Sequence, residues 1–215
     1  MIVLGILLSA LCAYLLGSIN SAILVSKLYA GDDIRNHGSG NAGMTNVLRT
    51  YGKGPAALTA IGDFGKGALA VLIGRLIFHI LGIENVDGGY VAGFFALLGH
   101  LFPIYFGFKG GKGVLTSSGV VLVLHPLMFF VLALIVIPTM FITKIVSLGS
   151  ILAAVLFPIA TFFFCGMRFN LDLVFSLLIS GVVIYMHRAN IKRLLNGTEH
   201  KFGQSGTSSS KGKKR

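Results

Sequence analysis

Charged residues are scarce in this chain, and acidic residues are scarcer still. Only 12% of its 215 residues are charged, whereas 54% are hydrophobic; a soluble domain carries roughly 25% charged residues. A chain with so few polar groups cannot cover a packed globule with them, which excludes most soluble folds. Intrinsic disorder is excluded as well, because it combines low hydrophobicity with high net charge.

Patterns typical of disulfide frameworks and metal sites are also missing from the sequence. Its 2 cysteines, Cys12 and Cys165, fall inside or at the rim of apolar segments, where we expect small, inert residues. We find no paired carboxylates, no His/Cys spacing typical of a metal site and no Ser-His-Asp pattern. We therefore expect neither a metal nor another cofactor.

Long runs without a charged residue dominate the sequence. A helix needs about 20 apolar residues to cross ~30 Å of hydrocarbon, and these runs are apolar all round, as helices in lipid are. His125-Pro126 divides the longest run, because proline disfavours helix at the residue before it. The sequence predicts an all-α polytopic membrane protein with seven spans at 3–28, 55–79, 89–107, 113–124, 126–143, 146–166 and 170–187. The alternative has six spans, with one long tilted helix in place of the two spans 113–124 and 126–143.

The basic residues are confined to a few segments. There are 18 Lys and Arg against 7 Asp and Glu, a formal net charge of +11. With seven spans most cations fall on one side, so the positive-inside rule places the C-terminus in the cytoplasm and the N-terminus outside. Residues 1–200 are predicted to form one membrane domain, and 201–215 a basic, disordered tail that associates with anionic headgroups. The small cytoplasmic area argues against nucleic-acid binding.

Glycines, hydroxyls and amides crowd one predicted cytoplasmic loop, residues 38–46. Gly38, Gly40 and Gly43 match G-x-G-x-x-G, but a membrane span precedes them instead of a strand, which excludes a dinucleotide fold. Such glycines still let backbone N–H groups converge on an oxyanion, and Arg49 offers a bidentate phosphate ligand. The loop therefore indicates a phosphate site, with a merely flexible loop as the alternative.

Two further polar clusters fall on the same side. In 109–112, two lysines flank two glycines, which is typical of a compact anion site or of a basic turn beside the membrane. His187 and Asn190 share a helix face, and Ser147 is a lesser pointer. Together the three clusters indicate binding of one or two phosphates at the bilayer surface.

Asp63, Lys66 and His100 are ionisable residues that lie well inside predicted spans. Asp63 and Lys66 are three positions apart, so we expect them to neutralise each other with a structural role. His100 is expected to be a structural, hydrogen-bonded histidine.

Three motifs resemble those of the bacterial acyl-phosphate:glycerol-3-phosphate acyltransferases. They are Gly-Ser-Gly-Asn-x-Gly-x-Thr-Asn at 38–46, Gly-His…Pro…Phe-Lys-Gly-Gly-Lys-Gly at 99–113, and His-Arg-x-Asn-Ile-x-Arg-Leu-x-x-Gly-Thr-Glu at 187–199. The resemblance extends through about Phe202. It implies a multi-pass protein of the bacterial plasma membrane, with its active site facing the cytoplasm. The implied reaction moves a fatty acyl group from acyl phosphate to the 1-hydroxyl of glycerol 3-phosphate, giving lysophosphatidic acid and phosphate in phospholipid biosynthesis.

The resemblance also implies roles for individual residues. The expected catalytic residues are Ser39, His187, Arg49 and Lys109. The expected substrate-binding residues are Gly38, Gly40, Asn41, Gly43, Thr45, Asn46, Gly110, Gly111, Lys112, Ser147 and Asn190. We expect direct attack by the glycerol hydroxyl, with a substrate phosphate taking the proton and the acyl chain lying between helices. A ping-pong route through acylated Ser39, and His187 as general base, are the chemical alternatives.

A phosphate or organic-anion transporter, or a membrane scaffold subunit, is the alternative from another class. Transporters tend to place binding groups near the bilayer midplane within repeated halves. Here the anion-binding groups gather at one interface, and no internal repeat is evident. We expect the protein to be a monomer.

Overall fold

The computed structural model describes residues 1–167 and 169–202, and every regular element within them is a helix. The all-α prediction is thus confirmed for this part of the chain. Most of the predicted basic tail lies outside the described residues. In order, the helices are α1 (Ile2–Gly17), α2 (Ser21–Ala30), η1 (Ile34–Asn36), α3 (Met44–Tyr51), α4 (Lys53–Ile80), α5 (Gly88–Leu101), η2 (Ile104–Phe106), α6 (Val114–Leu124), α7 (Pro126–Thr143), α8 (Val146–Phe164), α9 (Leu171–Met186) and α10 (Arg188–Leu195).

Five segments are long and apolar enough to cross a membrane: 2–30, α4, 88–106, α7 and α8. A sixth is obtained if α9 and α10, which meet at a bend of 59°, count as one broken span. The remaining predicted span, α6, has 11 residues and is a shorter apolar helix. The structure therefore supports a helical membrane protein with five or six candidate spans among the described residues.

The first predicted span, 3–28, is not one continuous helix. It breaks after Gly17, and α2 restarts where the Asn20 side chain accepts a hydrogen bond from the Ile23 amide, at 3.1 Å. The break leaves the Ile19 carbonyl free of the helix, and the Lys66 ammonium donates to it at 2.8 Å. The candidate span 2–30 thus covers the predicted 3–28 but contains a break, which no proline or charge in the sequence marks.

Proline determines two other helix ends. α6 ends at Leu124 and α7 begins with Pro126 at its first position, as predicted from His125-Pro126. α5 ends at Leu101, two residues before Pro103, so it is shorter than the predicted 89–107. As a result His100 lies in the last turn of α5 instead of deep within a span.

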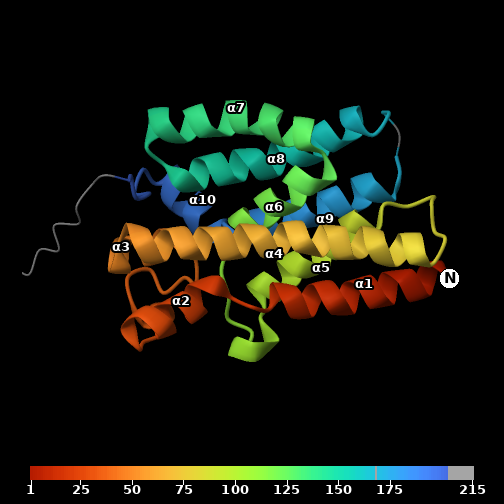
Figure 1. The fold of residues 1–215 in the computed structure, drawn as a ribbon. Helices are drawn as coiled ribbons and strands as arrows, with labels where there is room; N and C mark the ends of the chain where they lie inside the picture. Colours follow the sequence, from red (N-terminus) through yellow and green to blue (C-terminus); the bar gives the residue numbers. More distant parts are fainter. Residues whose placement is uncertain (168, 203–215) are drawn as a thin grey trace, which may run out of the picture.

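The helices form two packed groups. α4 packs against α1, α5 and α6, while α7, α8 and α9 pack in sequence beside them (Figure 1). Close approach depends on small residues: a Cβ on Gly17 would lie 2.1 Å from the Ala96 carbonyl oxygen, and one on Gly119 would lie 2.0 Å from that of Phe64. Figure 1 places α3 and α10 at one end of the bundle and the N-terminus at the other.

Candidate active site

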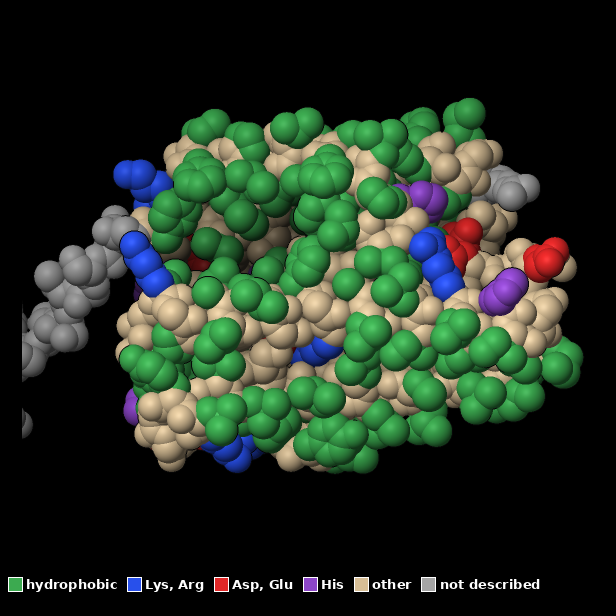
Figure 2. Space-filling model, in the orientation of Figure 1, with side chains coloured by type: hydrophobic (Ala, Val, Ile, Leu, Met, Phe, Trp, Pro, Cys, Tyr) green, Lys and Arg blue, Asp and Glu red, His purple; other side chains and the backbone are tan. Residues whose placement is uncertain are grey.

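A cavity of about 670 Å³ opens at the end of the bundle that carries α3 and α10. Figure 2 shows the surface hollowed between α7 and α4, with hydrophobic side chains around the hollow. The volume is within the range of small-molecule sites. The predicted site residues that line it are Ser39, Asn41, Gly43, Thr45, Asn46, Arg49, Lys112, Ser147, His187 and Asn190. Residues from all three motifs therefore meet in one place.

Asn46 organises the glycine-rich loop. Its side-chain oxygen accepts a hydrogen bond from the Ser39 amide at 3.0 Å, and its amide group donates to the carbonyls of Ile34, His37 and Asn41. Asn46 is only 2% exposed. This residue thus shapes the loop from within, and the exposed Ser39 and Arg49 are left facing the cavity.

Four predicted site glycines shape the backbone and do not line the cavity. Gly38 and Gly40 have φ of +55° and +70°, which favours glycine. A Cβ on Gly110 would lie 1.9 Å from the His100 carbonyl oxygen, and one on Gly111 would lie 2.3 Å from the His100 ring. The glycines of the second motif therefore let the chain pass close against the end of α5.

Lys109 also lies outside the cavity. It is exposed and borders a second hollow of about 520 Å³, together with Arg35 and Gly110. Arg35 is paired with Asp33 at 2.7 Å and donates to the carbonyls of Phe106 and Lys109. Of the two lysines in the second motif, only Lys112 reaches the main cavity.

Lys112 connects the second motif with the third. Its ammonium donates a hydrogen bond to the Asn190 side-chain oxygen. Burial and the positive charges of Arg193 and Arg49 lower the pKa of Lys112 below its ordinary value, although Glu199 opposes them. No hydrogen bond or ion pair occupies Arg49 within the described residues. The cavity thus concentrates positive charge, which an anionic ligand would stabilise.

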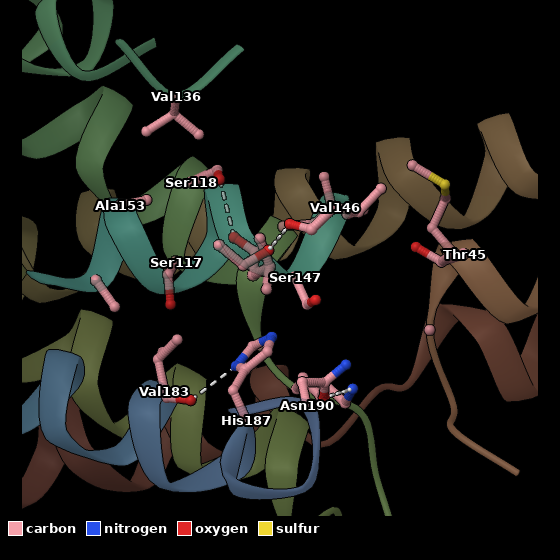
Figure 3. A pocket seen from close by; sticks show the side chains of 18 of the residues that line it. Thr45, Ser117, Ser118, Val136, Val146, Ser147, Ala153, Val183, His187 and Asn190 are labelled. Carbon is pink, nitrogen blue, oxygen red and sulfur yellow. Dashed lines mark hydrogen bonds between the residues drawn. The ribbon is translucent and has the colours of Figure 1, made fainter. Parts of the chain in front are cut away.

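His187 is oriented by the backbone at the bend between α9 and α10. Its Nδ1 lies 2.8 Å from the Val183 carbonyl oxygen, and the residue is 2% exposed. Because a carbonyl only accepts, Nδ1 carries the hydrogen, and Nε2 of the neutral ring is left as an acceptor. Figure 3 shows the His187 ring, Asn190 and Ser147 around a common space.

Glu199 fixes the polar end of the cavity from the segment after α10. Its carboxylate accepts hydrogen bonds from Ser147 at 2.8 Å, Asn190 at 2.7 Å and Arg193 at 2.7 Å. Burial raises the pKa of Glu199, but these hydrogen bonds outweigh it and hold the pKa below its ordinary value. Ser147 and Asn190 are thereby held in place by one carboxylate.

Glu199 and Arg193 line the cavity but were not among the predicted site residues. One signal could have identified Glu199: it is the only acidic residue after Asp172, in a segment rich in Lys and Arg. An isolated acid among cations indicates a pairing role. Arg193, like Glu199, belongs to the third motif at 187–199, and that membership was the signal for it.

Asp63, Lys66 and His100 form one buried group. Lys66 lies 2.9 Å from Asp63 and 2.9 Å from Nδ1 of His100. Asp63 and His100 are 1% and 3% exposed, yet both contribute to the cavity wall. The predicted neutralisation of Asp63 by Lys66 is confirmed, and His100 joins them as the expected hydrogen-bonded histidine.

Taken together, these features define a helical membrane protein whose cavity suits a ligand with an anionic end and an apolar tail. A family model described as glycerol-3-phosphate acyltransferase matches residues 7–197. Proteins named glycerol-3-phosphate acyltransferase match from Clostridioides difficile (strain 630), 47% identical over 91% of this chain and 94% of that protein, and from Neisseria meningitidis serogroup C (strain 053442), 45% identical over 90% and 95%.

Two solved structures agree in fold as well as sequence. Both are crystal structures of PlsY (YgiH), an integral membrane glycerol 3-phosphate acyltransferase. The glycerol 3-phosphate form is 40% identical, covers 92% of this chain and 96% of that chain, and has a TM-score of 0.82. The lysophosphatidic acid form is 37% identical, covers 92% and 95%, and has a TM-score of 0.78. The chain belongs to the glycerol-3-phosphate acyltransferase family.

Proposed function

We propose that this protein transfers a fatty acyl group from acyl phosphate to the 1-hydroxyl of glycerol 3-phosphate, releasing lysophosphatidic acid and phosphate. The observation that carries the proposal is a single cavity with a cationic end and an apolar end. Arg49, Lys112 and Arg193 line the first, and side chains of α6, α7, α8 and α9 line the second. Both substrates are phosphorylated and one has a hydrocarbon tail, which matches this division. The related structures with glycerol 3-phosphate and lysophosphatidic acid support it.

The site suits direct transfer between two bound substrates. The glycerol O1 attacks the acyl carbon, the bond from that carbon to the phosphate oxygen breaks, and phosphate leaves with the electron pair. The proton of the hydroxyl passes to a substrate phosphate, with Nε2 of His187 as the alternative acceptor. Because acyl phosphate is a mixed anhydride, positioning and charge stabilisation suffice for catalysis.

The described contacts suggest how roles are divided. Arg49 and Lys112 hold the phosphates, Ser39 and His187 orient the reacting groups, and hydrogen bonds from the remaining cavity-lining residues complete the site. Lys109 stays a prediction, and its position outside the cavity makes Lys112 the better candidate for phosphate contact. No metal or cofactor is part of this scheme.

We further propose the predicted topology, in which residues 1–200 form one domain with seven spans and the N-terminus lies outside. The protein resides in the inner membrane of a bacterium, and its site faces the cytoplasm. The N-terminus and α10 lie at opposite ends of the bundle, which supports an odd number of crossings (Figure 1). In this arrangement α6 is a short span that packs against α4 and α5. The domain acts as a monomer.

Donor choice is the decisive test. Purified protein in proteoliposomes is given glycerol 3-phosphate with acyl phosphate, acyl-CoA or acyl carrier protein, and lysophosphatidic acid is quantified by mass spectrometry. We expect product from acyl phosphate alone. Anion flux across the vesicle without acyl transfer would support the transporter instead. Rapid quench without glycerol 3-phosphate tests direct transfer, since trapped acyl-protein at Ser39 would establish the ping-pong route.

A further inference from the structure

The apolar part of the cavity ends inside the bundle. Its deepest lining residues on α6, α7, α8 and α9 are Val121, Phe129, Phe157 and Ile179. Beyond them the helices meet: Met128 and Thr161 are fully buried, and the Thr161 hydroxyl lies 4.0 Å from the Met128 sulfur. A chain that enters from the polar end therefore reaches a packed wall.

The depth of this space follows from helix geometry. On α7, Phe129 lies eleven residues from Met140, about 16 Å at a rise of ~1.5 Å per residue. The Met140 side chain packs against Gly149, which lies two residues, about 3 Å, beyond Ser147 at the polar end. Ser147 and Phe129 are thus about 20 Å apart along the bundle. A zigzag hydrocarbon advances ~1.25 Å per carbon, from C–C bonds of about 1.5 Å, so about 16 carbons span it.

Phe129 is held at this depth from the other side of the hollow. Its ring meets that of Phe64 on α4 edge to face, with centroids 6.3 Å apart and planes at 75°. Because α4 and α7 border the hollow (Figure 2), this aromatic pair links its two sides. One turn closer to the polar end on the same face of α7, Ala133 also lines the cavity but leaves it open. The large side chain of Phe129 therefore leaves less space in the cavity than the small side chain of Ala133.

We propose that Phe129 sets the upper limit of acyl-chain length, at about 16 carbons, and that the small side chain of Ala133 keeps the path to it open. This inference rests on the proposed function, because the occupant is the acyl chain of the donor. A ceiling of this kind should discriminate between donors, since one methylene in an apolar pocket changes kcat/KM by about tenfold or more.

The test is a competition between donors in a single tube. Wild type and variants receive an equimolar mixture of decanoyl to eicosanoyl phosphates with glycerol 3-phosphate, and the lysophosphatidic acids are resolved by mass spectrometry. Product ratios do not depend on how much of each variant is folded. For the wild type we expect a fall of about tenfold from the hexadecanoyl to the octadecanoyl product. Phe129→Ala should remove most of that fall.

Matched control variants distinguish an effect of substitutions inside the cavity from an effect of substitutions on the exposed face of α7. Phe130, next to Phe129, is 58% exposed and absent from the cavity wall, so Phe130→Ala should keep the wild-type ratios. Ala133→Phe should move the preferred donor to dodecanoyl or shorter, and Leu134→Phe on the exposed face should not. If Ala133→Phe does not fold, Ala133→Leu replaces it and should shift the preferred donor in the same direction but by fewer carbons.

The outcomes are distinct. Equal ratios in wild type, Phe129→Ala and Phe130→Ala, or equal shifts in both phenylalanine variants, would overturn the role of Phe129. Absence of product from the wild type with every donor would overturn the proposed function and this inference with it. A normal wild-type yield with an unchanged Phe129→Ala profile rejects only the inference.

Discussion

The Ser147 hydroxyl donates a 2.8 Å hydrogen bond to the Glu199 carboxylate, 52 positions further along the chain. Ser147 lies in the first turn of α8, whereas Glu199 follows α10. A second contact reinforces the pairing, because the Phe202 amide donates to the Lys144 carbonyl at 2.8 Å. The segment after α10 is thereby fastened over the start of α8, where the polar end of the cavity lies.

Glu199→Ala should destabilise the protein and abolish activity together. The substitution leaves Ser147 and Asn190 without their shared acceptor and Arg193 without its counter-charge. Loss of a buried charged acceptor costs about 1–3 kcal/mol or more. Thermal unfolding in detergent, followed by circular dichroism, measures the first effect. Lys192→Ala removes an exposed residue of the same helix and should match wild type. A Glu199→Ala variant of wild-type stability would contradict the role assigned to this carboxylate.

Stability should also depend on pH through Glu199. Burial raises the pKa of this carboxyl, but hydrogen bonds from Arg193, Asn190 and Ser147 outweigh it and keep the pKa below the ordinary 4.5. For a carboxyl with a lowered folded-state pKa, the stabilisation is complete above the unfolded value and is lost as pH falls through the folded one. The difference in melting temperature between wild type and Glu199→Gln should therefore be largest above pH 4.5 and should shrink at more acidic pH. A difference that does not vary with pH would argue against ionisation as the cause.

Binding of glycerol 3-phosphate should weaken on the alkaline side because of Lys112. Burial and the nearby Arg193 lower its pKa below the ordinary 10.5, so the ammonium charge is present at neutral pH and is lost as pH rises through the lowered value. Calorimetric titration of the empty protein should show Kd increasing before pH 10.5. In Lys112→Arg the charge persists to higher pH, and this alkaline weakening should disappear. If both proteins weaken equally, another group is responsible.

His187→Ala should lower kcat far more than it changes the KM for glycerol 3-phosphate. The ring is oriented by the Val183 carbonyl, and within the described residues Nε2 makes no hydrogen bond. Loss of a positioned acid–base group typically costs 10²–10⁴-fold in rate. If His187 takes the proton, the acidic limb of the pH–rate profile disappears in the variant. If it only orients the substrates, kcat falls while the profile keeps its shape.

Lys66→Met should destabilise the protein strongly, by about 3–5 kcal/mol, because it leaves Asp63 charged and buried. The double variant with Asp63→Asn should recover part of that loss, since the unpaired charge is removed as well. Lys53→Ala, at an exposed position on the same helix, provides the control. Thermal unfolding of wild type, Lys66→Met, Asp63→Asn and the double variant completes the cycle. A double variant less stable than Lys66→Met alone would show that Asp63 has an essential partner other than Lys66.

Charge and hydropathy were enough to predict much of the fold. The polar clusters and motifs were enough to predict most of the polar residues that line the cavity. Uncharged runs predicted the long helices, and His125-Pro126 predicted the α6–α7 break because proline acts locally. The break after Gly17 could not be predicted, since the Lys66 ammonium that donates to the freed Ile19 carbonyl is distant in sequence. The same limit applies to the second motif. Spacing showed two lysines flanking glycines but not which one faces the cavity, because that depends on how the turn packs against His100.

The position of Glu199 also determines when the polar end of the cavity is fixed as the chain is made. Chains are synthesised from the N-terminus at roughly 5–20 residues per second, and early segments fold first. The helices that hold the apolar path are therefore all in place before the carboxylate that fixes Ser147, Asn190 and Arg193 has been added. Ser147, Asn190 and Arg193 therefore gain their shared acceptor only after α10 has been made.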